Sequence, residues 1–374
     1  MSGAFREDAK YMNRALELAR RGEGRVSPNP MVGCVIVKNG KIIGEGWHEG
    51  AGHPHAEINA LNQAGCDIAG ADVYVTLEPC AHQGKTGPCA DALIEARVQS
   101  VAYAVGDPDK KAAGGGARLK AAGIRVRAGL CEAQARRLNE AWFHFIETGR
   151  PFITGKTASS LDGRIATQTG ESQWITSAQS RTKAQAFRKR ADAIIVGANT
   201  VATDNPSLTA RDEEDRPFEN IYQPLRVVLD SAGRTDPAAS IFSMQGRGAL
   251  LAATSKLSTA RRAAFEKAGA EVAILPASPD GRVDLPALAE TLAARGCCAA
   301  MVEGGGETLG AFLKAGLIDR LYAFVAVGMI IGADGKPSVS GLNVSALSEA
   351  VSLRNILIEP LGNDLLISGA PARR

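Results

Sequence analysis

The sequence predicts two consecutive α/β domains, and three observations lead to that expectation. The chain has 374 residues, more than one hydrophobic core usually contains. Short apolar strands alternate with amphipathic helices in both halves, a pattern typical of layered domains with largely parallel sheets. The segment Thr148-Gly149-Arg150-Pro151 ends a helix with a glycine and a proline. We therefore expect one domain over residues 1–149 and a second over residues 150–374.

The first domain is expected to begin with a helix and a hairpin. Apolar residues recur at helical spacing within residues 1–24, where charged side chains interrupt any signal-peptide core. The turn dipeptide Asn39-Gly40 separates two apolar strands, 31–37 and 41–47. The remaining elements expected are helices at 55–64, 88–96, 113–122 and 132–147, and strands at 73–77, 101–105 and 124–127.

The second domain restarts the alternation after the boundary. Its expected strands are 193–196, 226–229, 249–253, 271–275, 299–302 and 320–327. The segments 353–358 and 365–368, separated by Gly362-Asn363, are expected to form a closing antiparallel hairpin. No internal repeat relates the two halves, so they are separate folds rather than copies.

Composition narrows the classes of function. The net charge of +3 is too small to indicate binding to nucleic acid or to a membrane surface, and no run of 18 apolar residues occurs. The seven cysteines are an odd number and nothing indicates export, so thiols or metal ligands are expected rather than disulfides. We therefore expect a cytoplasmic protein that acts on a small molecule.

The strongest chemical signal is His55-Ala56-Glu57 followed by Pro79-Cys80 and Pro88-Cys89. Catalytic zinc takes three protein ligands and a water, and His55, Cys80 and Cys89 supply such a set. Glu57 is expected to move protons between that water and a departing amine, as in zinc nucleobase deaminases. Either half of the pattern alone is common by chance, but the ordered combination on a helix–strand–helix unit is specific. The sequence therefore predicts a zinc-dependent hydrolytic deaminase in the first domain.

A second signal lies where Val302-Glu303 runs into Gly304-Gly305-Gly306 and a helix. Glycines let the backbone approach a diphosphate, and a helix N-terminus offers amide donors. The segment lacks the usual dinucleotide fingerprint of glycines, so by itself it indicates a cofactor site only weakly.

Longer motifs around these residues closely resemble the RibD family of bifunctional riboflavin biosynthesis proteins. In the first half they cover residues 27–37, 53–57 and 76–89, and the insertion between Cys80 and Cys89 is itself a mark of that family. In the second half they cover residues 156–166, 170–176, 197–211 and 302–309. One departure is Val327-Gly328, which stands where the family usually has a Pro-Lys pair.

The resemblance implies a fold and a pair of activities. The fold is an N-terminal cytidine-deaminase-like α/β/α domain followed by a dihydrofolate-reductase-like α/β domain. The first activity is deamination of 2,5-diamino-6-(5-phosphoribosylamino)pyrimidin-4-one with Zn²⁺. The second is reduction of the ribosyl group of 5-amino-6-(5-phosphoribosylamino)uracil to ribityl with NADPH. The family also suggests a homo-oligomer, at least a dimer.

Substrate contacts in the first domain are expected from Asn29, His82 and Lys85. Asn29 can both donate to and accept from a pyrimidine edge. His82 and Lys85 lie in the insertion, where they can approach the sugar or its phosphate. A solvated lysine on a loop is the alternative for Lys85.

Contacts in the second domain follow from the resemblance. Carried over by motif, the residues facing NADPH are Ala158, Trp174, Thr200, Asp204, Ser231, Gly305 and Gly306. Those facing the substrate are Ser172, Arg188, Leu208, Arg211 and Glu303. Arg188 and Arg211 suit a 5′-phosphate because a guanidinium binds phosphate with two parallel bonds. Arg188 also lies in a basic run, so a solvated helix face is its alternative.

Two other functions remain open at this point. The chain could deaminate another aminopurine or aminopyrimidine, with a C-terminal half that only binds a ligand. It could also be a nucleic-acid editing deaminase, but single-strand binding needs basic grooves and stacking faces. The near-neutral charge and the aromatic content of 5% disfavour that alternative.

Overall fold

A computed structural model describes residues 3–65, 67–82, 87–243 and 247–372. The chain divides into two compact units, Met1–Gly149 and Arg150–Arg374. Among the described residues, no helix has both the length and the apolar character needed to cross a membrane.

The first unit contains a five-stranded sheet in the order β2-β1-β3-β4-β5. Its strands are β1 (Gly33–Lys38), β2 (Lys41–Trp47), β3 (Asp72–Leu77), β4 (Ser100–Val105) and β5 (Arg125–Ala128). Asn39 and Gly40, with φ of 52° and 72°, make the tight turn of the expected hairpin. β1 is antiparallel to both β2 and β3, whereas β3, β4 and β5 are parallel. The sheet is therefore mixed, and its parallel half carries the helices that follow β3 and β4.

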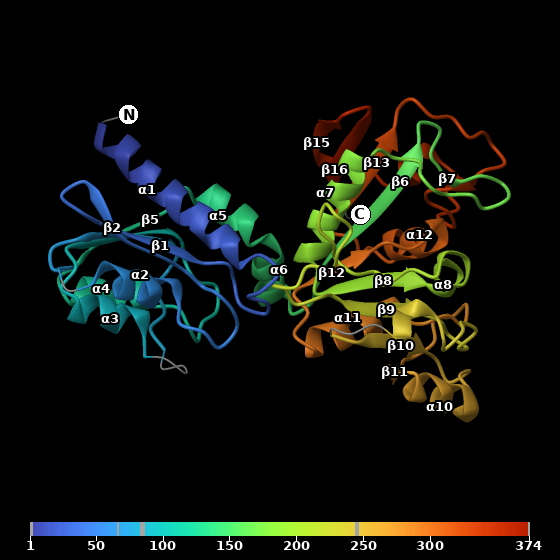
Figure 1. Ribbon diagram of the computed structural model, residues 1–374, viewed down its shortest axis with the longest axis horizontal. Coiled ribbons are helices and arrows are strands. Elements are labelled where there is room, and N and C mark those ends of the chain that lie inside the picture. The colour runs from blue at the N-terminus through green and yellow to red at the C-terminus, as the bar shows by residue number, and fades with distance from the viewer. Residues whose placement is uncertain (1–2, 66, 83–86, 244–246, 373–374) are drawn as a thin grey trace. The chain divides into compact units, whose positions relative to one another are not determined.

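Helices cover both faces of this sheet (Figure 1). α1 (Gly3–Ala19) and α5 (Glu132–Leu138) pack on one face, while α2 (Ala56–Ala64), α3 (Cys89–Glu95) and α4 (Gly115–Ala121) lie on the other. Ile36, Val73 and Leu93 belong to the buried cluster between the sheet and α2–α4. The expected α/β/α architecture of the first domain is confirmed.

One expected helix of the first unit is broken. The pattern over 132–147 predicts a single helix, but the structure has α5 and a separate α6 (Glu140–Thr148). Between them Asn139 leaves the helical conformation, with φ of −108° and ψ of 25°. Its side chain binds both main-chain atoms of Met31, the amide at 2.8 Å and the carbonyl at 2.8 Å. The side chain of Asn139 is therefore fixed to a distant residue at the point where the two helices meet.

The second unit contains a nine-stranded sheet in the order β11-β10-β9-β8-β12-β6-β13-β16-β15. Neighbouring strands from β11 to β13 are parallel, and β16 and β15 add two antiparallel neighbours at one edge. The strands are β6 (Phe152–Ser160), β8 (Ala193–Gly197), β9 (Leu225–Leu229), β10 (Ala249–Ala253), β11 (Ala270–Ile274), β12 (Ala299–Val302), β13 (Arg320–Ala326), β15 (Leu353–Leu361) and β16 (Asp364–Pro371). A separate pair joins β7 (Arg164–Ala166) to β14 (Lys336–Pro337).

Both faces of the large sheet are buried at its central parallel strands. Ile195 and Val227 face a core that includes α11 (Leu285–Ala294) and α12 (Gly306–Lys314). The adjacent Ile194 points to the opposite core, because successive side chains of a strand alternate between faces. That core includes residues of α7 (Ala178–Arg190), α8 (Ala198–Asp204), α9 (Ser240–Ser243) and α10 (Thr259–Lys267). The expected layered α/β architecture of the second domain is confirmed.

The strand order places an opening in the second unit. From β8 the chain continues to β9 on one side, while β12 and β6 lie on the other side. In open parallel sheets such a reversal leaves a crevice at the carboxyl ends of the strands, where ligands bind. The loops after β8, β9 and β12 therefore meet at one edge of the sheet.

Candidate active sites

The structure brings His55, Cys80 and Cys89 together in the first unit. His55 caps the N-terminus of α2, Cys80 follows β3 closely, and Cys89 is the first residue of α3. The Nδ1 atom of His55 lies 3.3 Å from the Sγ of Cys89 and 3.6 Å from the Sγ of Cys80. All three ligand atoms lie within 4.8 Å of one another. This is the one group of three or more potential metal ligands found among the described residues.

These separations fit a zinc ion. Zn–S bonds of about 2.3 Å and Zn–N bonds of about 2.0–2.1 Å in a tetrahedron put nitrogen and sulfur about 3.6 Å apart. The donor set of one imidazole and two thiols is also one that zinc prefers. Three protein ligands leave the fourth position for water, as a catalytic site requires.

The surroundings of Cys80 and Cys89 shift the pKa values of their thiols. The Cys89 side chain beside it lowers the pKa of Cys80 to about 4, and the Cys89 main-chain amide donates to the same sulfur at 3.4 Å. The pKa of Cys89 is raised by that same contact with Cys80. A bound cation would favour the loss of the proton from both thiols.

Glu57 lies beside this cluster in the first turn of α2. Glu57 is 3% exposed, and its carboxyl group hydrogen-bonds with Cys89. Burial raises the pKa of Glu57 to about 7, although His55 opposes the shift. A carboxyl group of this pKa can take up a proton and release it near neutral pH.

A cavity of about 600 Å³ opens over the cluster. Asn29 and His82, both expected at the substrate, line it, and His82 is exposed. Lys85 lies outside the described residues. The Asn29 Nδ2 lies 3.0 Å from the Nε2 of His48, and the Nδ1 of His48 lies 3.2 Å from the Pro54 carbonyl oxygen. This chain fixes the Asn29 amide and leaves its oxygen available to a ligand.

Two further residues of this cavity were missed by sequence reasoning. His48 is buried, and burial lowers its pKa, so the ring is neutral and accepts from Asn29. Asp107 lines the cavity at the end of β4, and burial raises its pKa to about 6. The clustered histidines were a signal for His48, whereas Asp107 becomes visible only once β3 and β4 are placed side by side.

In the second unit, Glu303 joins two cations. Its carboxylate lies 2.8 Å from the Nε of Arg188 and 3.1 Å from the Nζ of Lys156. Burial by itself would raise the pKa of Glu303, but Arg188 and Lys156 outweigh it and hold the pKa at about 2. Arg188 also donates to the carbonyl oxygen of Thr209 at 3.1 Å. Arg188 is therefore part of an ion cluster rather than a solvated helix face, and Lys156 is a member that sequence reasoning missed.

Other expected substrate residues of the second unit have varied surroundings. Arg211 donates to the hydroxyls of Thr209 and Ser207 at 2.9 and 2.8 Å and pairs with Asp215 at 2.8 Å. Leu208 is 3% exposed and its side chain lies in the hydrophobic core. A contact between Leu208 and substrate therefore has to come from its main chain. Ser172 is half-buried.

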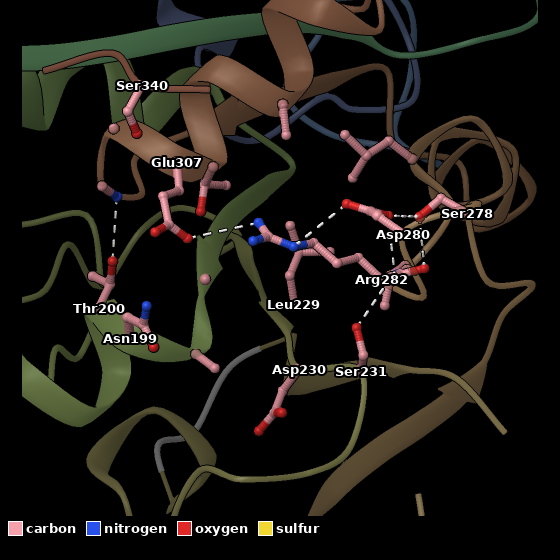
Figure 2. Close-up of a pocket in the computed structure, with 18 of the residues that line it drawn as sticks. Asn199, Thr200, Leu229, Asp230, Ser231, Ser278, Asp280, Arg282, Glu307 and Ser340 are labelled. Atoms are coloured by element: carbon pink, nitrogen blue, oxygen red, sulfur yellow. Dashed lines mark hydrogen bonds and ion pairs between the residues drawn. The ribbon is translucent and has the colours of Figure 1, made fainter. Parts of the chain in front are cut away.

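A cavity of about 1020 Å³ lies at the edge where β8, β9 and β12 end (Figure 2). Four of the seven residues expected at NADPH line it: Thr200, Ser231, Gly305 and Gly306. Ala158, Trp174 and Asp204 are not part of its lining. Ala158 lies on β6, Trp174 is 65% exposed, and Asp204 ends α8.

The glycine turn of this cavity has one open position. A Cβ at Gly304 or Gly306 would lie 2.9 Å from Thr308 or 2.4 Å from the Pro337 oxygen, so packing explains both glycines. A Cβ at Gly305 would lie 4.0 Å from its nearest neighbour, the Thr200 hydroxyl. Beside it α12 begins, and the first amides of a helix have no partner within the helix. The residues present therefore fit a dinucleotide whose diphosphate approaches Gly305.

Comparison with known proteins matches both units. Residues 151–367 match the family described as "RibD C-terminal domain". Residues 5–105 match the family described as "Cytidine and deoxycytidylate deaminase zinc-binding region". The chain is 40% identical to the riboflavin biosynthesis proteins RibD of Bacillus amyloliquefaciens and of Escherichia coli. Each match covers 96% of this chain, with 95% and 98% of the respective relative.

Solved structures agree along the whole chain. RibD of Acinetobacter baumannii is 36% identical and superposes with a TM-score of 0.89, covering 99% of this chain and 100% of its own. A Thermotoga maritima protein described as a diaminohydroxyphosphoribosylaminopyrimidine deaminase/5-amino-6-(5-phosphoribosylamino)uracil reductase is 33% identical, with a TM-score of 0.86 and the same coverage. The chain therefore belongs to the RibD family of riboflavin biosynthesis proteins and is a bifunctional deaminase and reductase.

Proposed function

We propose that the two units act in sequence on one pyrimidine. The first removes the C2 amino group of 2,5-diamino-6-(5-phosphoribosylamino)pyrimidin-4-one with zinc. The second uses NADPH to reduce the ribosyl group of the resulting 5-amino-6-(5-phosphoribosylamino)uracil to ribityl. The observation that carries the proposal is the convergence of His55, Cys80 and Cys89 beside a buried Glu57, in a chain that matches the Thermotoga protein from end to end.

In the deaminase unit, His55, Cys80 and Cys89 would hold the metal. Bound zinc supplies a Lewis acid that makes a water nucleophilic at neutral pH. Glu57, whose pKa burial raises to about 7, would take one proton from that water and give it to the ring nitrogen as the oxygen adds to C2. It would then take the remaining proton from the added hydroxyl and give it to the amine, so that ammonia leaves as the C2 carbonyl forms. Burial of Glu57 keeps bulk water from competing for these protons.

Asn29 would orient the pyrimidine over the cluster. Because its amide nitrogen is engaged by His48, the oxygen is directed to accept from the ring N–H or an amino group. His82, exposed at the cavity, would face the sugar phosphate. Lys85 keeps its expected role at the phosphate as a prediction from the sequence alone.

In the reductase unit, bound NADPH would supply the hydride for reduction at C1′ of the ribosyl group. Glu303 holds Lys156 and Arg188 in ion pairs, and their remaining N–H groups would bind the polar substrate. Arg211 has its guanidinium fixed by Ser207 and Thr209, which suits recognition of the 5′-phosphate. Ser172 and the Leu208 main chain would complete the substrate contacts. Thr200, Ser231, Gly305 and Gly306 would contact NADPH, with Ala158, Trp174 and Asp204 beyond the main cavity.

We also propose that the protein is a cytoplasmic homo-oligomer, at least a dimer. Ligand thiols such as Cys80 and Cys89 stay reduced in the cytoplasm. The outer strand β15 exposes Ile356, Leu357 and Ile358 by 54%, 62% and 62%, which suits burial against a second copy. Light scattering after gel filtration tests the oligomer, and a monomer at working concentration would contradict it.

The sequential reaction can be tested in one assay. NADPH oxidation is followed with only the undeaminated diaminopyrimidine ribosyl phosphate supplied, for the zinc-loaded and zinc-stripped enzyme. Steady oxidation that disappears on zinc removal, and returns when the deaminated uracil compound is added, supports both steps. Oxidation by zinc-stripped enzyme on the undeaminated compound would contradict the proposed order.

A further inference from the structure

The large cavity of the second unit has a cationic end that the proposed roles do not use. Arg234, Lys256 and Arg282 line it and come from the segments that follow β9, β10 and β11. The Glu303 cluster, in contrast, lies at β12 and its neighbour β6. The sheet order is β9-β8-β12-β6, and the Gly305 turn follows β12. The three cations therefore lie on the β9 side of this turn, and the Glu303 cluster, where the substrate would be reduced, lies on the β6 side.

The order of the strands therefore determines which way a bound dinucleotide would run across the sheet. A nicotinamide ring must lie near the Glu303 cluster, where the substrate is reduced. With the diphosphate at Gly305 and the start of α12, the rest of the molecule extends towards β9. The adenosine ribose then lies beside the loop that follows β9, which contains Ser231 and Arg234.

This loop is a fixed turn that presents Arg234. The Oδ2 of Asp230 accepts from the amide and the hydroxyl of Thr235 at 2.7 and 2.9 Å. Arg261 donates to the carbonyl oxygen of Gly233 at 2.8 Å. Arg234 itself is exposed, and its guanidinium makes one long bond, 3.4 Å, to the Oδ1 of Asn199. No carboxylate pairs with Arg234 in the part of the chain that the structure describes.

Ser231 adds a second donor on the same turn. Its Oγ accepts from the Val283 amide at 3.1 Å, so its hydroxyl hydrogen remains free to donate. Its carbonyl oxygen is fixed by the amide and the hydroxyl of Thr254 at 3.0 and 2.9 Å. In Figure 2 the Ser231 hydroxyl points towards Arg282, whereas Asp230 points away from it.

Asp230, the acidic residue next to Ser231, does not face the cavity with its carboxylate. Asp230 is 2% exposed, one carboxylate oxygen is bound to Thr235 and the other is buried. A carboxylate that faces the adenosine ribose accepts from its 2′-hydroxyl and favours the unphosphorylated coenzyme, whereas an arginine there accommodates a 2′-phosphate. Here the accessible groups of the turn are both donors.

The other two cations are partly compensated. Arg282 lies between Asp280 and Glu307, 3.6 Å from each carboxylate (Figure 2). Lys256 donates to the carbonyl oxygen of Gly281 at 3.0 Å. Arg234 is therefore the cation of this end whose charge is most available to an anion.

We propose that Arg234, together with the Ser231 hydroxyl, binds the 2′-phosphate of NADPH and makes the reductase unit prefer NADPH to NADH. The inference rests on the proposed function, because it requires that the large cavity binds a nicotinamide dinucleotide. Arg282 and Lys256 contribute less, because their cationic groups already have partners.

The test measures binding rather than turnover. Isothermal titration calorimetry gives the Kd of NADPH, of NADH and of 2′,5′-ADP for the wild type, Arg234→Ala, Arg282→Ala and Arg262→Ala. Arg262 is the matched control, because it is an exposed arginine of α10 that pairs with Glu266 and does not line the cavity.

The expected result is a loss confined to the phosphorylated ligands. Arg234→Ala should bind NADPH and 2′,5′-ADP about 10- to 100-fold more weakly, the usual size of a charge-assisted bond, with an unchanged Kd for NADH. Arg282→Ala should show a smaller loss, and Arg262→Ala none. Arg234→Lys should recover part of the preference, since it keeps the charge but loses the planar donor geometry.

Three results would overturn the inference. One is a wild type that binds NADPH and NADH equally, and another is an unchanged preference in Arg234→Ala. The third is an equal loss of both coenzymes in Arg234→Ala, which would show a structural role. In each of these cases dinucleotide binding by the wild type, and with it the proposed function, would stand. If the wild type bound neither coenzyme, the proposed function itself would fail.

Discussion

The two sites of this protein are assembled in different ways. In the first unit, His55 and Cys89 are 34 residues apart, and two helix starts and a strand end bring the ligands together. In the second, Lys156 and Glu303 are 147 residues apart and meet because β6 and β12 are neighbouring strands. The first cluster has two cysteines and a histidine that would bind a cation, whereas in the second cluster the Glu303 carboxylate already pairs with Lys156 and Arg188. Loss of one group should therefore be all-or-none in the first site and graded in the second.

The largest effect is expected from loss of a zinc ligand. Cys89→Ala removes one of three protein ligands, so bound zinc and deamination should both disappear. Reduction of the already deaminated substrate should continue at the wild-type rate. Metal analysis and separate assays of the two steps measure this. Full zinc content in Cys89→Ala would remove the thiol from the proposed ligand set.

Glu57→Gln separates the metal from proton transfer. Glutamine keeps the size of the side chain but cannot carry the proton, so deamination should fall about 10²- to 10⁴-fold while zinc stays bound. Ammonia release measures the rate. Asn59→Ala, also on α2, is the matched control; its amide donates to the Trp47 carbonyl oxygen rather than to the cluster. Normal turnover by Glu57→Gln would contradict its role.

Glu303→Gln tests the prearranged charges of the second site. It leaves Lys156 and Arg188 without their carboxylate, so we expect a loss of up to about 3–5 kcal/mol in the stability of that unit. The pKa of Glu303 is lowered to about 2, so its stabilising effect is present above its unfolded pKa of about 4.3 and is lost as the pH falls towards 2. The gap between wild type and variant should therefore shrink between pH 5 and about pH 2.5. Scanning calorimetry measures this difference in stability, using the unfolding transition whose temperature NADPH raises. A difference that does not change with pH would contradict the ionised state of Glu303.

Arg211→Ala and Arg188→Ala should raise the KM for the phosphorylated substrates of the reductase, by about tenfold for one charge-assisted contact. Arg211 is the cleaner test, because Arg188 also pairs with Glu303. Arg216→Ala provides the control, since Arg216 is an exposed arginine that pairs with Asp212 and Glu214. An unchanged KM in Arg211→Ala would leave that residue as a structural arginine of its loop.

The smallest effect is expected at Gly305. Alanine fits there without a clash but projects towards the Thr200 hydroxyl, so folding should be unchanged while NADPH binds several-fold more weakly. Gly306→Ala is the contrasting variant, because its Cβ would meet the Pro337 oxygen at 2.4 Å. Melting temperature and NADPH titration separate the two. Unchanged NADPH affinity in Gly305→Ala would place the diphosphate elsewhere.

Prediction from the sequence was strongest where residues of a specific chemistry occur in a specific order along the chain. The combination of His55, Glu57, Cys80 and Cys89 predicted a zinc deaminase, and the RibD family membership supports it. The hairpin at Asn39-Gly40 was also predictable, since the local φ preferences of these two residues determine that turn. Strand β6 was not predicted, because Lys156, Thr157 and Ser159 hide its apolar pattern and β12 and β13 supply its partners.

The order of residues along the chain therefore determined the fold class, the family and the candidate zinc ligands, because those follow from short motifs and their sequence. Tertiary structure alone decided the rest. It bound the Asn139 side chain to Met31 where α5 and α6 meet, buried Glu57 enough to raise its pKa, and joined Lys156 to Glu303. It also withdrew Asp230 and left Arg234 uncompensated at the cavity. Burial and charge pairing depend on distances between remote segments, and a linear pattern does not contain those distances.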